Sequence, residues 1–397
     1  MVLRAGEQQT GTSVLTTTGK NNTKPLVDFR EFWALEHMGI TQEELEDPGF
    51  LKTYQNTIKR NIDGRYEILF PFRNNRRSVE TNKNIASIRL TNLLRKMTKE
   101  EKVEYHKIFV QYEKDGYIGE ADNSYDGVCT YLPHRPVIKT EAKTTKIRPV
   151  FDGSAHQQNK PSINDLLETG PNLNPEILAV LLRFRQNKIA WTADIAQAFL
   201  QIGIQEEHEQ LIRFLWIEDP DQESARVKEY RWKRVPFGLS CSPFILRAVI
   251  LKCLDEHQSA FPELTKQLGH QLYVDDWLGG ADNISEATLL IKQAKEVFQS
   301  AKMELRKWST NSSELQKTLE HVVKFQQDIV GMANTDTPIK ALGVTWDPLT
   351  DNLQFDPQRM MEDAQSLNKR PTKRKLFSLA LRVFDPLGLI SPVTLVA

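Results

Sequence analysis

Cysteine is scarce in this sequence, and the few cysteines present form no recognisable framework. The 397 residues include three of them, Cys129, Cys241 and Cys253, with no Cys-x-x-Cys spacing. An odd number of widely separated cysteines indicates neither a disulfide scaffold nor a zinc site. We therefore expect a protein that folds around a hydrophobic core in a reducing compartment.

Long apolar runs are absent as well. Stretches such as residues 177–182 fall far short of the roughly 18 apolar residues that span a bilayer. Residues 1–6 lack the apolar core of a signal peptide. These absences predict a soluble, intracellular protein.

Neither sign of charge is in excess, because 52 Lys and Arg residues balance 52 Asp and Glu residues. Any positive surface for nucleic acid must therefore be local. The composition is otherwise ordinary, with 40% hydrophobic residues, 19 Gly and 19 Pro, which excludes collagen-like and wholly disordered chains.

The pattern along the chain indicates an α+β protein. Residues 1–25 are rich in Thr, Gly, Asn and Gln and are expected to form a disordered tail or a linker. Helical spacing marks residues 86–115 and 176–186, and strands alternate with helices from 188 to about 310. This alternation predicts a sheet covered by helices.

A basic neighbourhood frames an expected strand that follows a turn at residues 63–64. Its members are Lys59, Arg60, Arg65, Arg73, Arg76 and Arg77. Such a cluster is either a solvated surface or a site that neutralises phosphates, and the sequence leaves both readings open.

Two segments carry carboxylates at expected strand ends. Residues 188–195 alternate as a half-buried strand that ends near Asp194, where a carboxylate is costly to bury unless it is paired or binds metal. Taken alone, Asp194 could simply cap the following helix. Asp275 and Asp276 lie where a second strand reverses, a position that by itself suits ordinary turn chemistry.

The combination of these carboxylates predicts a metal site. Adjacent like charges repel and favour a cation, and neighbouring strands in one sheet would bring Asp194 beside Asp275. Carboxylate oxygens suit two Mg²⁺ ions, which support in-line displacement at phosphorus. Nucleotidyl transfer or phosphodiester hydrolysis is the expected reaction class.

Ordered motifs then extend this prediction. They are Tyr-Val-Asp-Asp at 273–276, Asp-Ile-Ala-Gln-Ala-Phe at 194–199 and Pro-Phe-Gly-Leu-Ser-Cys-Ser-Pro at 236–243, with supporting segments at 131–139, 146–152, 170–174, 182–185, 305–309, 342–346 and 384–388. Over about residues 26–397 the sequence resembles a reverse transcriptase, specifically the BEL/Pao group of long-terminal-repeat retrotransposons. The resemblance implies an RNA-directed DNA polymerase that adds deoxynucleotides to a primer 3′-hydroxyl on an RNA or DNA template, with two Mg²⁺ or Mn²⁺ ions. The alternative is a catalytically inactive nucleic-acid-binding remnant.

The resemblance also implies a right-hand polymerase. Fingers are expected at about 60–185 and 205–240, with a palm formed by an antiparallel sheet covered by helices. The expected divisions are a tail at 1–25, an N-terminal helical and basic extension at 26–125, fingers and palm at 126–310, a palm end with a primer-grip-like hairpin at 311–360, and the start of a truncated thumb at 361–397. No protease, ribonuclease H or integrase signature is seen, so we expect a fragment of a polyprotein, cytoplasmic and in retrotransposon particles if the full element is made.

Site roles follow from the resemblance residue by residue. Asp194, Asp275 and Asp276 match the catalytic triad and, with the Ile195 carbonyl, the metal ligands. The expected nucleotide-binding residues are Lys139, Arg148, Gln197, Ala198, Phe199, Phe237 and Gly238, with Phe199 beneath the incoming sugar. Primer and template contacts are expected from Tyr273, Val274, Leu342, Gly343 and Trp346, and Lys307 is the candidate general acid.

Several of these residues have a plainer reading. Phe199 and Trp346 could be core residues, and Lys307 could be a surface lysine just after a helix. Arg148 and Lys139 could be surface cations, and Lys143 or Lys146 could replace Lys139. The run of Lys369, Arg370, Lys373, Arg374 and Lys375 suits a duplex backbone or a solvated face.

Overall fold

A computed structural model describes residues 48–73, 79–138, 147–222, 225–322, 339–354, 372–374 and 385–389. Helices and sheets are mixed along these ranges, which confirms the α+β prediction. The expected helical segments are present as α3 (Lys83–Lys96), α4 (Lys99–Lys114) and α6 (Ile177–Phe184). The tail predicted at 1–25 lies outside the described residues.

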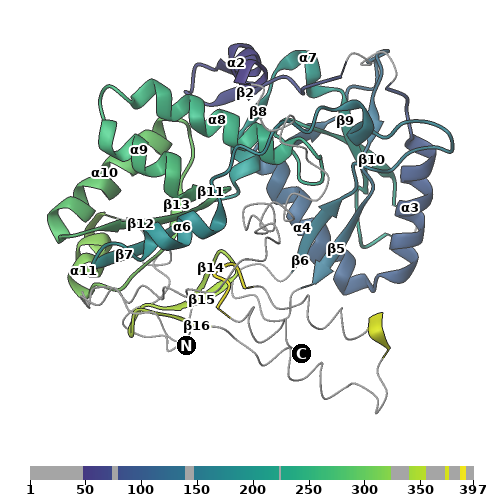
Figure 1. Ribbon diagram of the computed structural model, residues 1–397. Coiled ribbons are helices and arrows are strands. Elements are labelled where there is room, and N and C mark those ends of the chain that lie inside the picture. The colour runs from purple at the N-terminus through teal and green to yellow at the C-terminus, as the bar shows by residue number, and fades with distance from the viewer. Residues whose placement is uncertain are drawn as a thin grey trace, which may run out of the picture.

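One antiparallel sheet carries the expected carboxylates. Its order is β11 (Leu272–Tyr273), β12 (Asp276–Ala281), β7 (Ile189–Ile195) and β13 (Leu305–Thr310). Helices α6, α9 (Pro262–Gln271) and α10 (Ile284–Ser300) pack against β12, and α11 (Ser313–Val322) packs against β13 (Figure 1). The sheet is therefore covered by helices, as predicted.

Strand β7 is buried on both faces, not half-buried as its alternation suggested. Trp191 joins one core cluster, where its ring meets Trp277 at 5.4 Å, whereas Ala190 joins a second cluster. The second cluster includes residues of the hairpin sheet β14 (Ile339–Ala341), β15 (Val344–Asp347) and β16 (Asn352–Gln354). The prediction failed because small Ala and Thr side chains on the second face are compatible with either burial or exposure.

A second sheet is built on aromatic packing. Its order is β3 (Ile118–Glu120), β10 (Val227–Trp232), β9 (Ile212–Ile217) and β4 (Thr130–Tyr131), beside the hairpin β5 (His134–Ile138) and β6 (Ile147–Phe151). His134 lies among aromatic side chains of α4 and of the strands, and its ring centroid is 5.2 Å from the ring centroids of both Phe109 and Phe151. These contacts attach α4 to the sheet and the hairpin.

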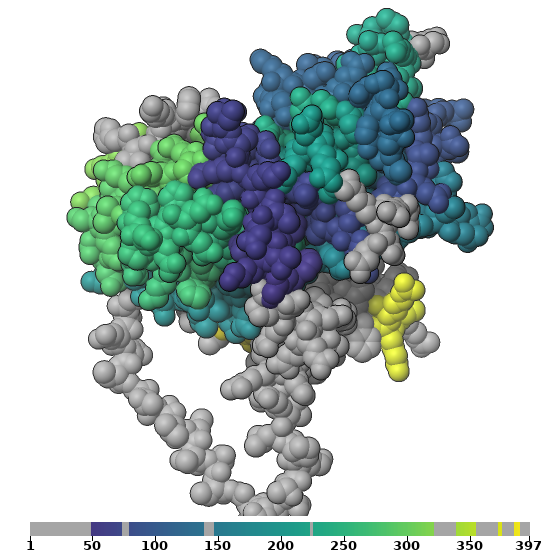
Figure 2. Space-filling view, turned by 90° about the horizontal axis from the view of Figure 1, so that it is seen from above, coloured from purple at the N-terminus to yellow at the C-terminus, as the bar shows by residue number. Residues whose placement is uncertain are grey.

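The N-terminal described segment lies between the region of the first sheet and the region of the second. Helix α2 (Pro48–Thr57) packs on α8 (Ser242–His257), and β2 (Tyr66–Ile68) pairs with both β1 (Lys59–Arg60) and β8 (Gly203–Ile204). Figure 2 shows this purple segment between the green and the blue regions. Shorter elements complete the chain: α5 (Ile163–Leu166), η4 (Ala198–Gln201) and α7 (Glu206–Glu209).

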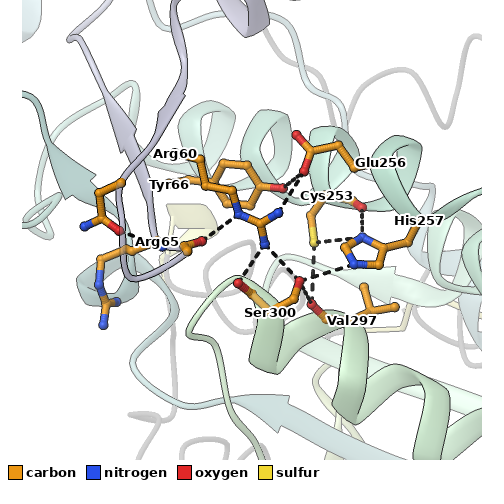
Figure 3. A network of polar contacts seen from close by, with 10 residues as sticks. Arg60, Arg65, Tyr66, Cys253, Glu256, His257, Val297 and Ser300 are labelled. Carbon is orange, nitrogen blue, oxygen red and sulfur yellow. Dashed lines mark hydrogen bonds and ion pairs between the residues drawn. The ribbon is translucent and has the colours of Figure 1, made fainter.

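The basic neighbourhood around β1 and β2 is used for internal contacts. Arg60 pairs with Glu256 at 3.2 Å and donates to the Ser300 carbonyl at 2.7 Å, so it ties the hairpin to the ends of α8 and α10 (Figure 3). Arg65 donates to the Gln201 carbonyl at 2.6 Å. Arg73 pairs with Glu168 at 3.5 Å. Arg76 and Arg77 lie outside the described residues.

No helix in the described ranges is long and apolar enough to span a bilayer. The proposed domain boundaries stay a prediction.

His134 should make folding stability depend on pH. Burial lowers its pKa from 6.5 to about 4, and its ring bridges the Tyr105 hydroxyl at 2.9 Å and the Leu215 carbonyl at 3.0 Å. The unfolded chain binds a proton below pH 6.5 that the native ring resists, so stability is lost as pH falls from 6.5 toward 4, by ~2 kcal/mol at pH 5. Denaturant titrations at pH 7.5 and 5 measure this loss.

The matched variant is His134→Gln, which keeps one donor and one acceptor. We expect it to be less stable than the parent at pH 7.5 but to lose less stability between pH 7.5 and 5. Equal losses in both proteins would show that other groups cause the pH dependence.

Candidate functional site

The three predicted carboxylates come together at one end of the sheet. Asp194 on β7 lies directly opposite Asp276 on β12 in the antiparallel register, so both side chains project from the same face. The Ile195 amide donates to the Asp275 carbonyl at 2.8 Å, which fixes the turn against the end of β7. The prediction that neighbouring strands would join these segments is confirmed, with Asp276 and not Asp275 as the residue directly opposite Asp194.

The turn between β11 and β12 has an unusual backbone. Val274 has φ of 54°, a left-handed conformation that β-branched residues rarely adopt. Its amide donates to the Asn174 side-chain oxygen at 3.2 Å. This tight turn lets Asp275 and Asp276 follow β11 without an intervening loop.

Lys307 reaches Asp194 from the other neighbouring strand. It follows α10, as expected, but within strand β13, and it sits in a bulge where the register with β7 shifts between Arg306 and Ser309. Its backbone is also left-handed, with φ of 52°. The Lys307 Nζ forms an ion pair with Asp194 Oδ2, so the bulge turns this cation toward the carboxylates.

The carboxylates of the turn are held in an unfavourable environment. Burial raises the pKa of Asp276 to about 7, and repulsion from Asp275 and Asp194 adds to this effect, with Lys307 opposing it. Burial also raises the pKa of Asp275, as does Asp194. Buried carboxylates that repel one another favour a cation or a proton.

The donor set fits hard divalent cations, although its present arrangement does not enclose one. Among the described residues, no three His, Cys, Asp or Glu side chains form a group that could hold a metal ion. Asp194 Oδ1 is nevertheless buried with no hydrogen-bond partner in that part of the chain, and its other oxygen is paired with Lys307. An orphaned carboxylate oxygen beside two more carboxylates matches the all-oxygen preference of Mg²⁺.

Two predicted nucleotide-site aromatics pack on each other, one of them five residues after Asp194. Phe199 in η4, directly after β7, packs edge-to-face on Phe237 at 5.3 Å, and Phe199 is only partly buried. Ala198 is buried, whereas Gln197 is exposed with φ of 49° and accepts from the Tyr117 hydroxyl at 2.8 Å. Four residues expected at the nucleotide site therefore lie together, three of them at 197–199 and the fourth, Phe237, in contact with Phe199.

Gly238 serves a close approach of protein backbone. It has φ of 93°, and a Cβ there would lie 2.2 Å from the Phe151 carbonyl oxygen at the end of β6. The glycine is therefore required for docking the loop before α8 onto the β5–β6 hairpin.

The expected triphosphate-binding cations are only partly described. Arg148 is exposed on β6, near enough to Tyr112 to lower the pKa of that phenol against the effect of burial. Lys139, Lys143 and Lys146 lie outside the described residues. In the basic run near the C-terminus, Lys373 and Arg374 are exposed, and Lys369, Arg370 and Lys375 are likewise outside.

The β14–β15 hairpin forms where a hairpin was expected, and Trp346 lies on its second strand. Leu342 and Gly343 make its two-residue turn with φ of 47° and 85°, a conformation typical of tight hairpins. Trp346 is fully buried and packs edge-to-face on Phe184 at 4.9 Å. Its side chain is therefore a core residue, and any primer contact is left to the turn.

Two residues near the site had no role assigned from the sequence. Asn174 lies in a segment that supported the resemblance, and an asparagine after a Pro-Asn-Leu run gave no sign of its long-range bond to Val274. Arg247 is a fully buried arginine on α8, and its signal was a charged residue within the apolar run of residues 244–250.

Comparison with known families agrees with this geometry. A family model described as "Reverse transcriptase (RNA-dependent DNA polymerase)" matches residues 135–346, just over half of the chain, including all three carboxylates. No curated protein sequence matches the chain.

In the absence of metal, the Asp276 carboxylate should lower the stability of the folded protein. Its native pKa of about 7 lies above the ordinary value of 3.8, so stability falls as pH rises from 3.8 to about 7 and stays reduced above that. We expect Asp276→Asn to raise the melting temperature in a chelator at pH 8 by at least ~2 °C, the shift that about 1 kcal/mol gives in a domain of this size. The gain should shrink toward pH 4.

The matched control is Asp126→Asn, the same change at an exposed carboxylate. Scanning calorimetry of both variants at pH 8 and 5 makes the comparison. A melting temperature of Asp276→Asn at or below that of the parent at pH 8 would contradict the assigned repulsion.

Proposed function

The chain belongs to the reverse transcriptase family, and from that membership we propose that it extends a primer 3′-hydroxyl with deoxynucleotides by a two-metal mechanism. The family is one of RNA-directed DNA polymerases, so the chain is a nucleotidyltransferase whose partners are template, primer and deoxynucleoside triphosphates. Divalent metal ions are general in this family. The observation that carries the proposal is the pairing of Asp194 with Asp276 across β7 and β12, beside Asp275.

Asp194, Asp275 and Asp276, with the Ile195 carbonyl, would hold the two Mg²⁺ ions. Bound there, the ions supply an activated 3′-hydroxyl and neutralise charge on the leaving phosphates. Lys307 would exchange its ion pair with Asp194 for the pyrophosphate and donate a proton to it. The bulge in β13 supports this role, because it directs a half-exposed ammonium group to the carboxylates.

The incoming sugar would lie over Phe199. Edge-to-face packing on Phe237 holds the Phe199 ring in one place, and a fixed ring next to the 2′ position leaves no room for a hydroxyl. Arg148, with Lys139, would bind the triphosphate, since an exposed guanidinium can bind phosphate through two donors.

A right-hand arrangement follows as part of the proposal. The palm would be the β11–β12–β7–β13 sheet with α8, α9 and α10, and the fingers the second sheet with the β5–β6 hairpin (Figure 1). The Leu342–Gly343 turn would contact the primer. The ordered motifs further support a BEL/Pao retrotransposon origin and function in cytoplasmic particles.

Asp275→Asn should abolish nucleotide incorporation without preventing duplex binding. Loss of one metal-binding carboxylate removes transition-state stabilisation, and we expect a rate at least ~100-fold lower. Template-primer affinity should stay within a few-fold, since phosphate contacts elsewhere supply most of it. Primer extension with Mg²⁺ and a binding titration measure the two effects.

Asp282→Asn is the control, an exposed carboxylate just beyond the end of β12. If Asp275→Asn and Asp282→Asn extend primers equally well, the site assignment is wrong. A parent protein that binds duplex but extends no primer would favour the inactive remnant instead.

Phe199→Val should relax selection against ribonucleotides. Removing the ring relieves the clash with a 2′-hydroxyl and costs the deoxynucleotide only packing, so the ratio of kcat/KM values should shift by about 10- to 200-fold. Single-nucleotide insertion kinetics with both sugars test this. The companion variant Phe237→Val should give a smaller shift, because it only loosens Phe199, whereas equal slowing of both substrates in Phe199→Val would make Phe199 a packing residue.

A further inference from the structure

Arg247 is a buried cation without a charged partner among the described residues. It lies in the middle of α8 with 2% of its surface exposed. Burial alone accounts for a pKa lowered to about 10, and no described carboxylate contributes to it. A buried ion is expensive to keep, and apolar residues of similar volume often serve stability equally well.

The donors of Arg247 join three backbone segments. Its Nε donates to the Leu173 carbonyl at 3.2 Å, its Nη1 to the Leu272 carbonyl at 3.2 Å, and its Nη2 to the Gly269 carbonyl at 2.6 Å. Gly269 and Leu272 mark the end of α9 and the start of β11, where carbonyl dipoles favour a cation. The guanidinium therefore fixes the segment ending at Leu173 against the strand that leads into the Val274 turn.

Asn174 connects this fixed segment to the turn itself. It follows Leu173, and its side-chain oxygen accepts from the Val274 amide at 3.2 Å. Val274 needs such support because its left-handed backbone, with φ of 54°, is unfavourable for a β-branched residue. On the other side of the turn, the Ile195 amide holds the Asp275 carbonyl.

We propose that Arg247 and Asn174 are positioning residues that hold the strained Val274 turn in the conformation that presents Asp275 and Asp276 beside Asp194. Arg247 acts through the Leu173 and Leu272 carbonyls, and Asn174 acts through the Val274 amide. Neither touches a reacting atom. The assignment deepens the proposed function and rests on it, since its consequence is the geometry of the metal-binding carboxylates.

Asn174→Ala is the decisive variant, because it removes the acceptor for the Val274 amide, together with a donor to the exposed Asn172 side chain, and leaves the core intact. We expect kcat to fall about 10-fold, the size of effect that loss of one supported strained residue gives, with nucleotide KM and duplex affinity within ~2-fold. Mn²⁺ affinity, measured by calorimetry without substrates, should fall as well. Asn123→Ala, at an exposed site, should change none of these quantities.

Glycine at position 274 separates positioning from general stabilisation. Glycine adopts positive φ without strain, so Asn174→Ala should reduce kcat and Mn²⁺ affinity much less when combined with Val274→Gly than in the parent. A reduction of the same size in both backgrounds would overturn the proposal, as would parental kcat and Mn²⁺ affinity in Asn174→Ala.

Arg247→Lys tests the other residue of the pair. A lysine keeps the charge but cannot reach three carbonyls in a fixed fork, so kcat and Mn²⁺ affinity should fall even when both are measured well below the melting temperature of the variant. Its effect and that of Asn174→Ala should be less than additive, because both act on one turn. Fully additive effects would overturn the shared role. The Mn²⁺ affinity is measured without turnover. A parent that binds Mn²⁺ but incorporates no nucleotide would contradict the proposed function, and the Mn²⁺ affinities of the variants would still test the positioning role.

Discussion

The register between β7 and β12 is the constraint on which the site depends. Asp276 lies opposite Asp194, and Gly279 lies opposite Trp191 in the same ladder. A Cβ at Gly279 would lie 2.2 Å from the Trp191 ring, so only a glycine fits opposite this tryptophan. A slip by one residue would turn Asp276 to the opposite face, and core packing within the ladder therefore fixes the carboxylates at its end.

Several residues of the site have an unfavourable charge or an unfavourable backbone conformation. Burial and mutual repulsion disfavour charge on Asp275 and Asp276, and Val274 and Lys307 both have left-handed backbones. Such strain persists only where surrounding structure fixes it. Here the support comes from the buried rings of Trp191, Trp277 and Trp308 on adjacent strands and from side chains that hold the turn.

Cationic residues show why local sequence could not assign roles. Arg60, Arg65 and Arg73 resemble a phosphate-binding cluster in sequence, yet their guanidinium groups bind Glu256, the Gln201 carbonyl and Glu168. Lys307 looked like a surface lysine after a helix, and a one-residue bulge brings it to Asp194. In each case the partner lies far away in the chain, so the spacing of the cations carries no information about it.

The sequence by itself determined the α+β class, the helical segments at 86–115 and 176–186, and the placing of the three carboxylates at strand ends, because periodicity and costly buried charges are local signals. Only the tertiary structure decided that β7 is buried on both faces, that Trp346 belongs to the core against Phe184, and that Gly238 is required by the Phe151 carbonyl. It also revealed Asn174 and Arg247, whose hydrogen bonds to Val274 in the turn and to Leu272 on β11 span 100 and 25 positions of sequence. Such contacts depend on which segments pack together, and that is a property of the whole chain.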